Sequence, residues 1–372
     1  MAEQENELLS QILLKAVALE ASDVHAAPGE PVHFRIDGSL TQEFFAELPD
    51  NRFNVEASED VAKSILSTAH QATLQKTGCV DGAISLDDTN RFRFNAFHRG
   101  GETCFAFRRL ANTVPGLDEL GLDERLYDLC GATDGLILVA GPTGSGKSTT
   151  IASLIDRINQ TRSCHIITIE DPVEFIHRSD QALVNQREVG TDVENFGDAL
   201  KGAMRQDPDV ILVGELRDLE TIRTAITAAE TGHLVFATVH AGDCKTAIER
   251  LVGAFSAEEQ NLAQRLVATV LRTVIVQHLL PRHKNPNIDR PQTTRRVLAS
   301  EVMHCNSGIS NLIATANLSQ IASIIQTSGD DGMWTLDDSL AKLWRSRSIS
   351  EQTARALARN PETLAQISRN RA

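Results

Sequence analysis

The feature that most constrains this chain is a glycine-rich segment, GPTGSGKST, at residues 141–149. It follows the continuous apolar run GLILVAG and leads into the helical pattern STTIASLIDRIN. A buried strand that turns through such a loop into a helix is the context in which the GxxxxGK[ST] motif binds phosphate. The glycines let backbone N–H groups close around phosphate oxygens, and the helix N-terminus adds partial positive charge. The sequence therefore predicts an ATP-binding phosphate loop.

Within this loop each residue type has an expected role. Lys147 is expected to bridge the β- and γ-phosphates of ATP, and Ser148 is expected to hold Mg²⁺. The predicted ATP-binding residues of the loop are Gly141, Pro142, Thr143, Gly144, Ser145, Gly146, Lys147, Ser148 and Thr149.

A second site follows the apolar run DVILVGE, which ends in Glu215. A carboxylate at the end of a strand beside a phosphate loop is expected to polarise the attacking water and to reach Mg²⁺ through water. The alternative is an ordinary loop carboxylate. The usual aspartate of the preceding position is Gly214 here. We therefore expect Mg²⁺ to be held by Ser148 and water rather than directly by an aspartate.

A third candidate is the acidic turn after HIITIED, where Glu170 ends a buried run. Taken alone, such a turn is more often solvated than functional. Beside a phosphate loop, Glu170 becomes a candidate for orienting water or metal.

Two histidines, His233 and His240, bracket a further buried strand, HLVFATVHA. His240 lies at the carboxyl end of the strand, where open α/β sheets bind ligands, so it is a candidate sensor of the γ-phosphate. His233 lies at the start and is expected to orient a neighbour. The intervening strand would hold the two side chains about 20 Å apart, which argues against a shared metal ion.

The first 111 residues are predicted to form a small α+β domain. Apolar residues from Leu8 to Leu19 recur at helical spacing, which indicates an amphipathic first helix. The alternating run PVHFRIDGSL contains Asp37-Gly38, a pair typical of hairpin turns.

The rest of this domain is expected to contain one helix over residues 55–77, ending at Gly78, and a hairpin that turns at Arg99-Gly100-Gly101. Its strands are rich in phenylalanine, and they carry the arginines Arg91, Arg93 and Arg108. These arginines either lie on solvated strand faces or reach the phosphates of a nucleotide across a domain or subunit boundary.

The pattern of apolar residues changes after the segment ANTVPGLDELGL, in which Asn, Pro and Gly are clustered. Continuous apolar strands alternate with helices, which predicts a parallel sheet and an α/β fold. We predict four parts, namely an α+β domain at 1–111, a linker at 112–118, a P-loop ATPase domain at 119–284 and a helical C-terminal portion at 285–372.

Composition narrows the class of function. The chain has 372 residues and a net charge of −14. A motor that coats nucleic-acid phosphates needs a basic face, so this charge disfavours a nucleic-acid translocase, although a local basic channel keeps that reading open. A non-hydrolysing nucleotide-binding scaffold would require loss of Lys147 or Glu215, and both are present.

The compartment is predicted from three further observations. The chain contains no run of about 18 apolar residues. Its start is acidic and lacks a basic n-region, so we expect no signal peptide. The six cysteines form no CxxC pair, as is typical of a reducing cytosol. We therefore expect a cytoplasmic protein.

Seven stretches in collinear order resemble the pilus retraction ATPases of the type II/IV secretion ATPase superfamily. They are ASDVHAAPGEPVHFRIDG, RFRFNAF, GLILVAGPTGSGKSTT, HIITIEDPVEFIH, LVNQREVG, AMRQDPDVILVGELRD and TIRTAITAAETGHLVFATVHA. The later segment GMWTLDDSLAKLW is similar to that family's GMQTLDQAL. The resemblance covers almost the whole chain.

The resemblance implies a PAS-like first domain, a RecA-like P-loop core with C-terminal helices, and a hexameric ring with ATP and Mg²⁺ between subunits. It implies a motor for type IV pilus retraction and twitching motility that acts on an inner-membrane platform protein. The expected location is the cytoplasmic face of the inner membrane, without direct membrane insertion and without a nucleic-acid partner.

The resemblance also assigns roles to residues. Glu170 falls in the family's acidic box, and Glu215 ends the Walker B strand. His233 and His240 fall in the histidine box, and Arg223 lies in a stretch associated with retraction. The basic positions of the first domain near the nucleotide match Arg91, Arg93 and Arg108.

Departures from the family pattern keep sister motors open as alternatives. Thr221, Ile226 and Ala241 differ from the usual residues in or near the retraction stretch, and residues 283–296 are polar and long. Pilus-assembly and secretion ATPases related to type II secretion carry a tetracysteine module after the catalytic strands. Only Cys244 and Cys305 lie there in this chain. A paralogous accessory retraction ATPase is a further alternative.

Overall fold

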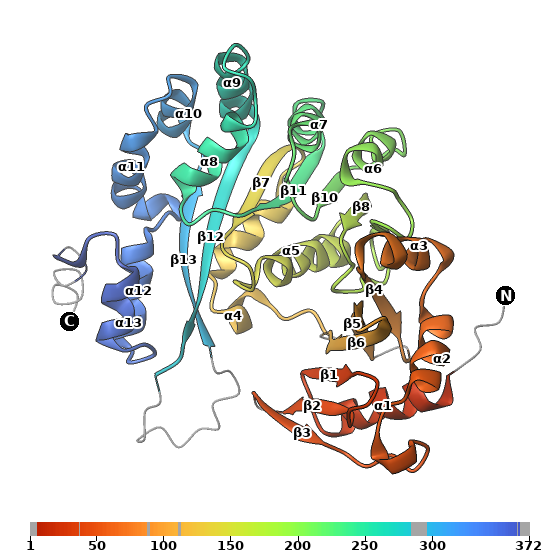
Figure 1. The fold of residues 1–372 in the computed structure, drawn as a ribbon. Helices are drawn as coiled ribbons and strands as arrows, with labels where there is room; N and C mark the ends of the chain where they lie inside the picture. The colour runs from red at the N-terminus through yellow and green to blue at the C-terminus, as the bar shows by residue number, and fades with distance from the viewer. Residues whose placement is uncertain are drawn as a thin grey trace. The chain divides into compact units, whose positions relative to one another are not determined.

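The computed structural model describes residues 6–36, 38–87, 90–110, 113–283, 296–362 and 364. The chain divides into two compact units, each with its own sheet (Figure 1). Unit 1 comprises Met1–Thr113, Asp171–Ile176 and Glu188–Glu194, and unit 2 comprises Val114–Glu170, His177–Arg187 and Asn195–Ala372. The division between Thr113 and Val114 falls within the linker predicted at 112–118, whereas the assignment of two later segments to unit 1 has no counterpart in the sequence prediction.

Unit 1 is built on an antiparallel six-stranded sheet in the order β3-β2-β1-β6-β5-β4. Phenylalanines at alternate positions of the two longest strands point into the core, since alternate residues of a strand share a face. The predicted hairpin is confirmed, with Arg99 paired to Glu102. The strands are β1 (Asp23–Ala26), β2 (His33–Ile36), β3 (Ser39–Gln42), β4 (Cys79–Ser85), β5 (Arg91–Arg99) and β6 (Glu102–Arg109).

The helices of unit 1 are α1 (Glu7–Ala18), α2 (Val55–Ile65) and α3 (Thr68–Thr77), with a 3-10 turn at Pro49–Asn51. The predicted first helix and the first hairpin, β2–β3, are confirmed, although Asp37 lies outside the described residues. The single helix predicted over 55–77 is wrong. Leu66 takes an extended conformation, and the Ser67 side chain accepts a hydrogen bond from the His70 N–H to cap a new helix.

Unit 2 contains a seven-stranded sheet in the order β13-β12-β7-β11-β10-β8-β9. The strands β8, β10, β11, β7 and β12 are parallel neighbours. The four apolar runs predicted as buried strands are β7, β8, β10 and β11, and the α/β class is confirmed. The strands are β7 (Gly135–Ala140), β8 (His165–Glu170), β9 (Leu183–Glu188), β10 (Val210–Val213), β11 (Leu234–Val239), β12 (Leu271–Pro281) and β13 (Arg296–His304).

The helices of unit 2 connect these strands and continue after β13. The α-helices are α4 (Leu117–Leu120), α5 (Lys147–Thr161), α6 (Phe196–Ala203), α7 (Leu219–Glu230), α8 (Cys244–Gly253), α9 (Gln260–Val270), α10 (Ser307–Ala314), α11 (Ile321–Thr327), α12 (Leu336–Arg345) and α13 (Glu351–Leu357). Shorter 3-10 segments lie at Glu124–Gly131, Leu318–Gln320 and Gly329–Asp331. No helix of the described part of the chain has the length and apolarity that a membrane crossing requires.

The prediction of a purely helical portion over 285–372 is wrong for its first described segment. Residues 284–295 lie outside the described residues, but β13 is a strand that pairs antiparallel with β12 along its length (Figure 1). The short apolar runs in the sequence of β13 are compatible with a helix as well as a strand. Pairing with the long strand β12 determines that this segment is a strand. Helices follow β13, as predicted.

The far side of β13 is covered by the segment before α12. Val302 and Trp334 exchange both backbone hydrogen bonds, with N···O distances of 3.0 and 3.2 Å. The Trp334 indole donates to Ser300 Oγ at 3.1 Å, and the Ser300 N–H donates to Ser339 Oγ at 3.1 Å. These bonds attach the C-terminal helices to the sheet.

Candidate functional site

The predicted phosphate loop connects β7 to α5 and depends on glycine at its first position. Gly141 has a φ of +149°, a conformation that side chains rarely adopt. A Cβ atom there would lie 2.4 Å from the Gln277 carbonyl oxygen and 2.4 Å from Ser145 Oγ. The backbone is therefore closely packed against β12, and only glycine fits at this position.

The polar groups of the loop fit a bound phosphate chain. Lys147 Nζ donates to the carbonyl oxygens of Gly141 and Pro142 at 3.0 and 3.1 Å, so its ammonium group lies over the loop. Ser145 Oγ is buried and has no hydrogen-bond partner among the described residues. Gly146 is the N-cap of α5, whose first N–H groups are the usual donors to phosphate.

Gln277 of β12 supports the loop from behind, and the sequence analysis did not identify it. Its side chain is fully buried, and Nε2 donates to Thr150 Oγ1 of α5 at 2.6 Å. A glutamine inside the apolar run LRTVIVQHLL is the sequence signal that marks this position. Gln277 thus joins α5 to the strand beside the loop.

Glu215 lies two residues after β10, and an arginine and a histidine contact its carboxylate. Arg217 Nη2 lies 2.7 Å from its Oε2, and His240 Nε2 lies 3.0 Å from its Oε1. The Glu215 side chain is only 17% exposed. These three residues and Arg250 contribute to the lining of a 170 Å³ cavity. We call Glu215, Arg217 and His240 the carboxylate cluster; Arg217 was not predicted.

Close packing explains why residue 214 is a glycine, and the sequence alone did not indicate this. Its N–H donates to the Ile169 carbonyl oxygen at 2.8 Å. A Cβ atom at this position would lie 3.2 Å from that oxygen and 3.4 Å from the Glu170 Cα. The strand ends β8 and β10 approach closely here, so a glycine is favoured over the aspartate of other P-loop enzymes.

Sheet register brings most predicted residues to one edge. Gly141, Glu170, Glu215 and His240 lie at or just after the carboxyl ends of β7, β8, β10 and β11, which are parallel neighbours. This is the edge at which open α/β sheets bind ligands. The Glu170 side chain accepts hydrogen bonds from Thr168 Oγ1 at 2.7 Å and from Gln186 Nε2 at 3.2 Å.

His233 is not brought to this edge. It lies at the opposite, amino end of β11, where Nδ1 is 2.9 Å from the Ala228 carbonyl oxygen and 3.2 Å from Thr231 Oγ1. These contacts close the C-terminal turn of α7. They place His233 on the far end of the strand from the phosphate loop of the same chain.

Most of the stretch TIRTAITAAETGH, residues 221–233, lies in α7, and its first departure from the family pattern, Thr221, fits the local packing. Thr221 is buried, and its N–H and Oγ1 donate to Asp218 at 2.9 and 2.8 Å. Burial raises the pKa of Asp218, but hydrogen bonds from Thr221 and from the backbone N–H groups of Glu220 and Asp218 together hold that pKa below its usual value. Arg223 pairs with Glu259 at 2.8 Å and lies over the Phe255 ring.

The three arginines of unit 1 all have partners within that unit. Arg91 Nη1 donates to the Val173 carbonyl oxygen at 3.1 Å, Arg93 lies 3.6 Å from Asp81, and Arg108 lies 2.8 Å from Asp23. Arg93 and Arg108 are directly opposite in register on β5 and β6. Like charges in such a pair destabilise a sheet, which favours a functional reason for them. Their contact with a nucleotide stays a prediction.

Comparison with known proteins gives a family and close relatives. Residues 2–355 match the model of the family described as Type II/IV secretion system protein. The chain is 39% identical to the type IV pilus retraction ATPase PilT of Pseudomonas aeruginosa, covering 95% of this chain and 99% of that one. It is 40% identical to a twitching motility protein of Neisseria gonorrhoeae, covering 89% of this chain and 85% of that protein.

Solved structures give the same result. The crystal structure of the pilus retraction motor PilT with bound ADP is similar with a TM-score of 0.85 and 41% identity, covering 96% of this chain and 99% of that chain. The ATPase DotB of Legionella pneumophila is similar with a TM-score of 0.81 and 26% identity, and 94% of each chain is covered.

Proposed function

We propose that this chain, which belongs to the type II/IV secretion system protein family, uses ATP hydrolysis to drive the retraction of a type IV pilus. Membership of the family is shown by a match over residues 2–355. The chain is an ATPase of this family. The observation that carries retraction is similarity to a pilus retraction ATPase at 39% identity over 99% of its length.

The structure supports a hydrolytic mechanism at the carboxyl edge of the unit 2 sheet. We propose that the phosphate loop holds the β- and γ-phosphates and that Lys147 exchanges its two carbonyl partners for phosphate oxygens. Glu215 then accepts a proton from the attacking water as general base. Arg217 and His240 orient its carboxylate. His240 also senses the γ-phosphate, so that the orientation of Glu215 depends on whether this phosphate is present.

Mg²⁺ fits the residues at the start of α5. Ser148 is the second residue of that helix and belongs to the loop that supplies the metal-ligating hydroxyl in P-loop enzymes. When bound, the metal neutralises charge on the β- and γ-phosphate oxygens. Gly214 leaves no direct carboxylate at the usual position, so water is proposed to complete the coordination, one ligand water being held by Glu215. Chelation of Mg²⁺ is expected to stop turnover.

The remaining predicted features are part of the same proposal. We propose a homo-hexamer in which Arg91, Arg93 and Arg108 contact the nucleotide, His233 orients a neighbouring group, and Glu170 orients water. The ring is proposed to act on an inner-membrane platform protein from the cytoplasmic side. Arg223, exposed on α7, is the residue of the retraction stretch proposed to transmit the change.

The experiment that tests this function has two parts. ATPase rate is measured against protein concentration, with mass determined by light scattering in the same samples. A rate per subunit that rises as a species of six subunits forms supports sites shared between protomers. A rate that stays flat in a monomer contradicts the ring motor.

Direction is tested in cells. The gene is expressed in a bacterium that has pili but lacks its retraction ATPase, and twitching is scored beside the Glu215→Gln variant. Restored twitching by the native chain alone supports retraction. Restored pilus assembly in a strain that lacks its assembly ATPase would instead favour the sister motor.

A further inference from the structure

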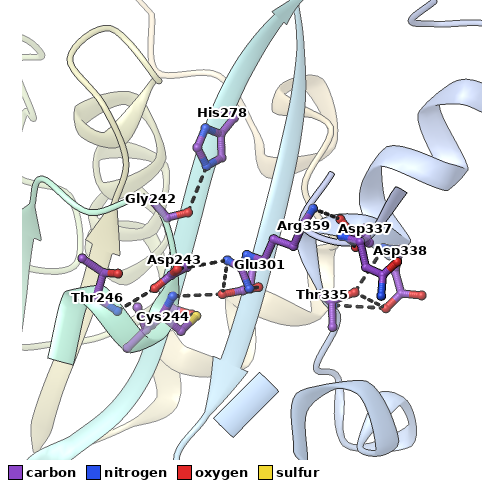
Figure 2. Close-up of polar contacts among 12 residues, drawn as sticks. Gly242, Asp243, Cys244, Thr246, His278, Glu301, Thr335, Asp337, Asp338 and Arg359 are labelled. Atoms are coloured by element: carbon purple, nitrogen blue, oxygen red, sulfur yellow. Dashed lines mark hydrogen bonds and ion pairs between the residues drawn. The ribbon is translucent and has the colours of Figure 1, made fainter. Parts of the chain in front are cut away.

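Glu301 is a buried carboxylate that joins three segments of unit 2. It lies in the middle of β13, and only 1% of the residue is exposed. A charge at such depth requires close partners, because desolvation strongly disfavours an isolated ion. Figure 2 shows the partners arriving from both sides of the strand, with the loop before α8 on one side and Arg359 on the other.

The first partner is the N-terminus of α8. The Cys244 N–H donates to Glu301 Oε1 at 2.9 Å. Asp243, the residue before this helix, caps it by accepting a hydrogen bond from the Thr246 N–H at 2.6 Å. Glu301 therefore fixes the point at which the loop from β11 enters α8.

The second partner is Arg359, which follows α13. Its Nη1 lies 2.6 Å from Glu301 Oε2, and Nη2 donates to Oε1 at 3.0 Å (Figure 2). Nη2 also lies 3.9 Å from Asp243. The planar guanidinium group thus contacts both the carboxylate and the loop that the carboxylate holds.

The backbone of Arg359 is itself held in place. Asp337, in the first turn of α12, accepts hydrogen bonds from the N–H groups of Arg359 and Asn360 at 2.9 and 3.0 Å. Asp337 is 8% exposed. The side chain of Arg359 therefore starts from a fixed backbone position. We call Arg359, Glu301 and Asp337 the C-terminal clamp.

The clamped loop begins at His240 of the carboxylate cluster. Only Ala241 and Gly242 separate His240 from Asp243. The loop is held at two further points, since Arg250 of α8 donates to the His240 carbonyl oxygen and His278 Nε2 contacts the Gly242 carbonyl oxygen at 3.2 Å. A shift of α8 would consequently move the backbone of His240.

We propose that Arg359 is a positioning residue for ATP hydrolysis, acting through Glu301 on the loop 240–244 and so on the contact between His240 and Glu215. This inference rests on the proposed ATPase site. It assigns the segment after α13 a role in turnover, although none of its residues belongs to the phosphate loop or to the carboxylate cluster.

The chain contains an internal reporter of the clamp. Cys244 is fully buried. This burial, and to a lesser extent the nearby Glu301 carboxylate, raises the pKa of its thiol. Burial keeps this thiol unreactive, because the thiolate is the reactive form. The Arg359 charge by itself lowers the pKa of the thiol, so faster labelling after loss of Arg359 would report exposure of Cys244 and not a change of charge. Cys130 is also buried but lies in the 3-10 segment Glu124–Gly131, so it reports on general loosening of unit 2.

The test uses the full chain and compares Arg359→Ala and Arg359→Lys with Arg355→Ala. Arg355 lies on α13 in the same region and pairs with the exposed Glu351, so it is the matched control. Alkylation of each cysteine is followed by peptide mass spectrometry, beside kcat, KM for ATP and ADP affinity. Arg359→Lys keeps the charge and guards against simple failure to fold.

We expect Arg359→Ala to label Cys244 about 10-fold faster with Cys130 unchanged, and to lower kcat about 10- to 100-fold at unchanged ADP affinity, since small misplacements of catalytic groups have effects of this size. Arg359→Lys should be intermediate and Arg355→Ala neutral. Equal acceleration at both thiols, or faster Cys244 labelling at unchanged kcat, would overturn the proposal. If the native chain hydrolyses no ATP, the proposed function fails, and the thiol rates still decide whether Arg359 holds the loop.

Discussion

The phosphate loop and the carboxylate cluster lie at the same edge of one sheet but are built in opposite ways. The loop is one continuous segment that presents mainly backbone groups. Its shape requires that residue 141 has no Cβ atom. The cluster consists of side chains that follow two different strands, and its geometry depends on the contacts of Glu215 with Arg217 and His240. Binding and turnover are therefore expected to respond to different substitutions.

The largest effect on turnover is expected from a substitution in the phosphate loop. Lys147→Ala should reduce turnover by about 10³-fold, because one preorganised charge contact is typically worth 10²–10³. Binding of a fluorescent ATP analogue should weaken in parallel, since the loop acts on both steps. Lys201→Ala, which removes an exposed lysine of α6, is the control and should behave as the native chain. Retained turnover in Lys147→Ala would remove the loop from the mechanism.

Glu215→Gln should separate ATP binding from turnover. We expect kcat to fall about 10²-fold, within the range of general-base contributions, while analogue binding stays close to native. The measurements are steady-state turnover and equilibrium binding. Glu220→Gln on α7 removes an exposed carboxylate and serves as control. Parallel loss of binding and turnover would mean that Glu215 supports the loop and is not the base.

Arg217→Ala tests whether the cluster needs its unpredicted member. Loss of the 2.7 Å contact leaves Glu215 held by His240 alone within the cluster. We expect kcat to fall about 10-fold, because the carboxylate keeps its chemistry but loses part of its orientation. Activity equal to that of the native chain would limit the functional cluster to Glu215 and His240.

The smallest effect on the fold is expected from Arg108→Ala in unit 1. Its ion pair joins an arginine side chain that is 73% exposed to the Asp23 carboxylate, which is 13% exposed and keeps a second contact with Arg35 at 3.9 Å. Free energy of unfolding, measured in urea, should change by less than about 1 kcal/mol. ATP turnover should nevertheless fall several-fold if this arginine contacts the nucleotide. Unchanged turnover would contradict that role.

These two regions also show what the sequence could predict. The phosphate loop was predicted residue by residue, because its chemistry is local and the apolar run before it requires a buried strand. Glu215 and His240 were predicted only as separate candidates. Their contact depends on strand order, which no local pattern contains, and Arg217 has no motif to distinguish it from a surface arginine.

Other differences have equally local causes. The break between α2 and α3 occurs because Ser67 caps a new helix, and a serine within a helical pattern does not by itself indicate this. Strand β13 was missed because pairing with β12 determines its conformation. Gln277 and Glu301 are polar residues within apolar runs. Their partners, Thr150 and Arg359, are distant in sequence and became visible only in the fold.

The covering of β13 by Trp334 has a consequence for self-association. An exposed edge strand is a template for further strands, and proteins commonly protect such edges. Here the outward backbone groups of Val302 already pair with Trp334, and the Ser300 N–H is bonded to Ser339. An incoming strand would have to displace this segment before it could extend the sheet. The β13 edge is therefore expected to resist extension of the sheet by a second copy of the chain.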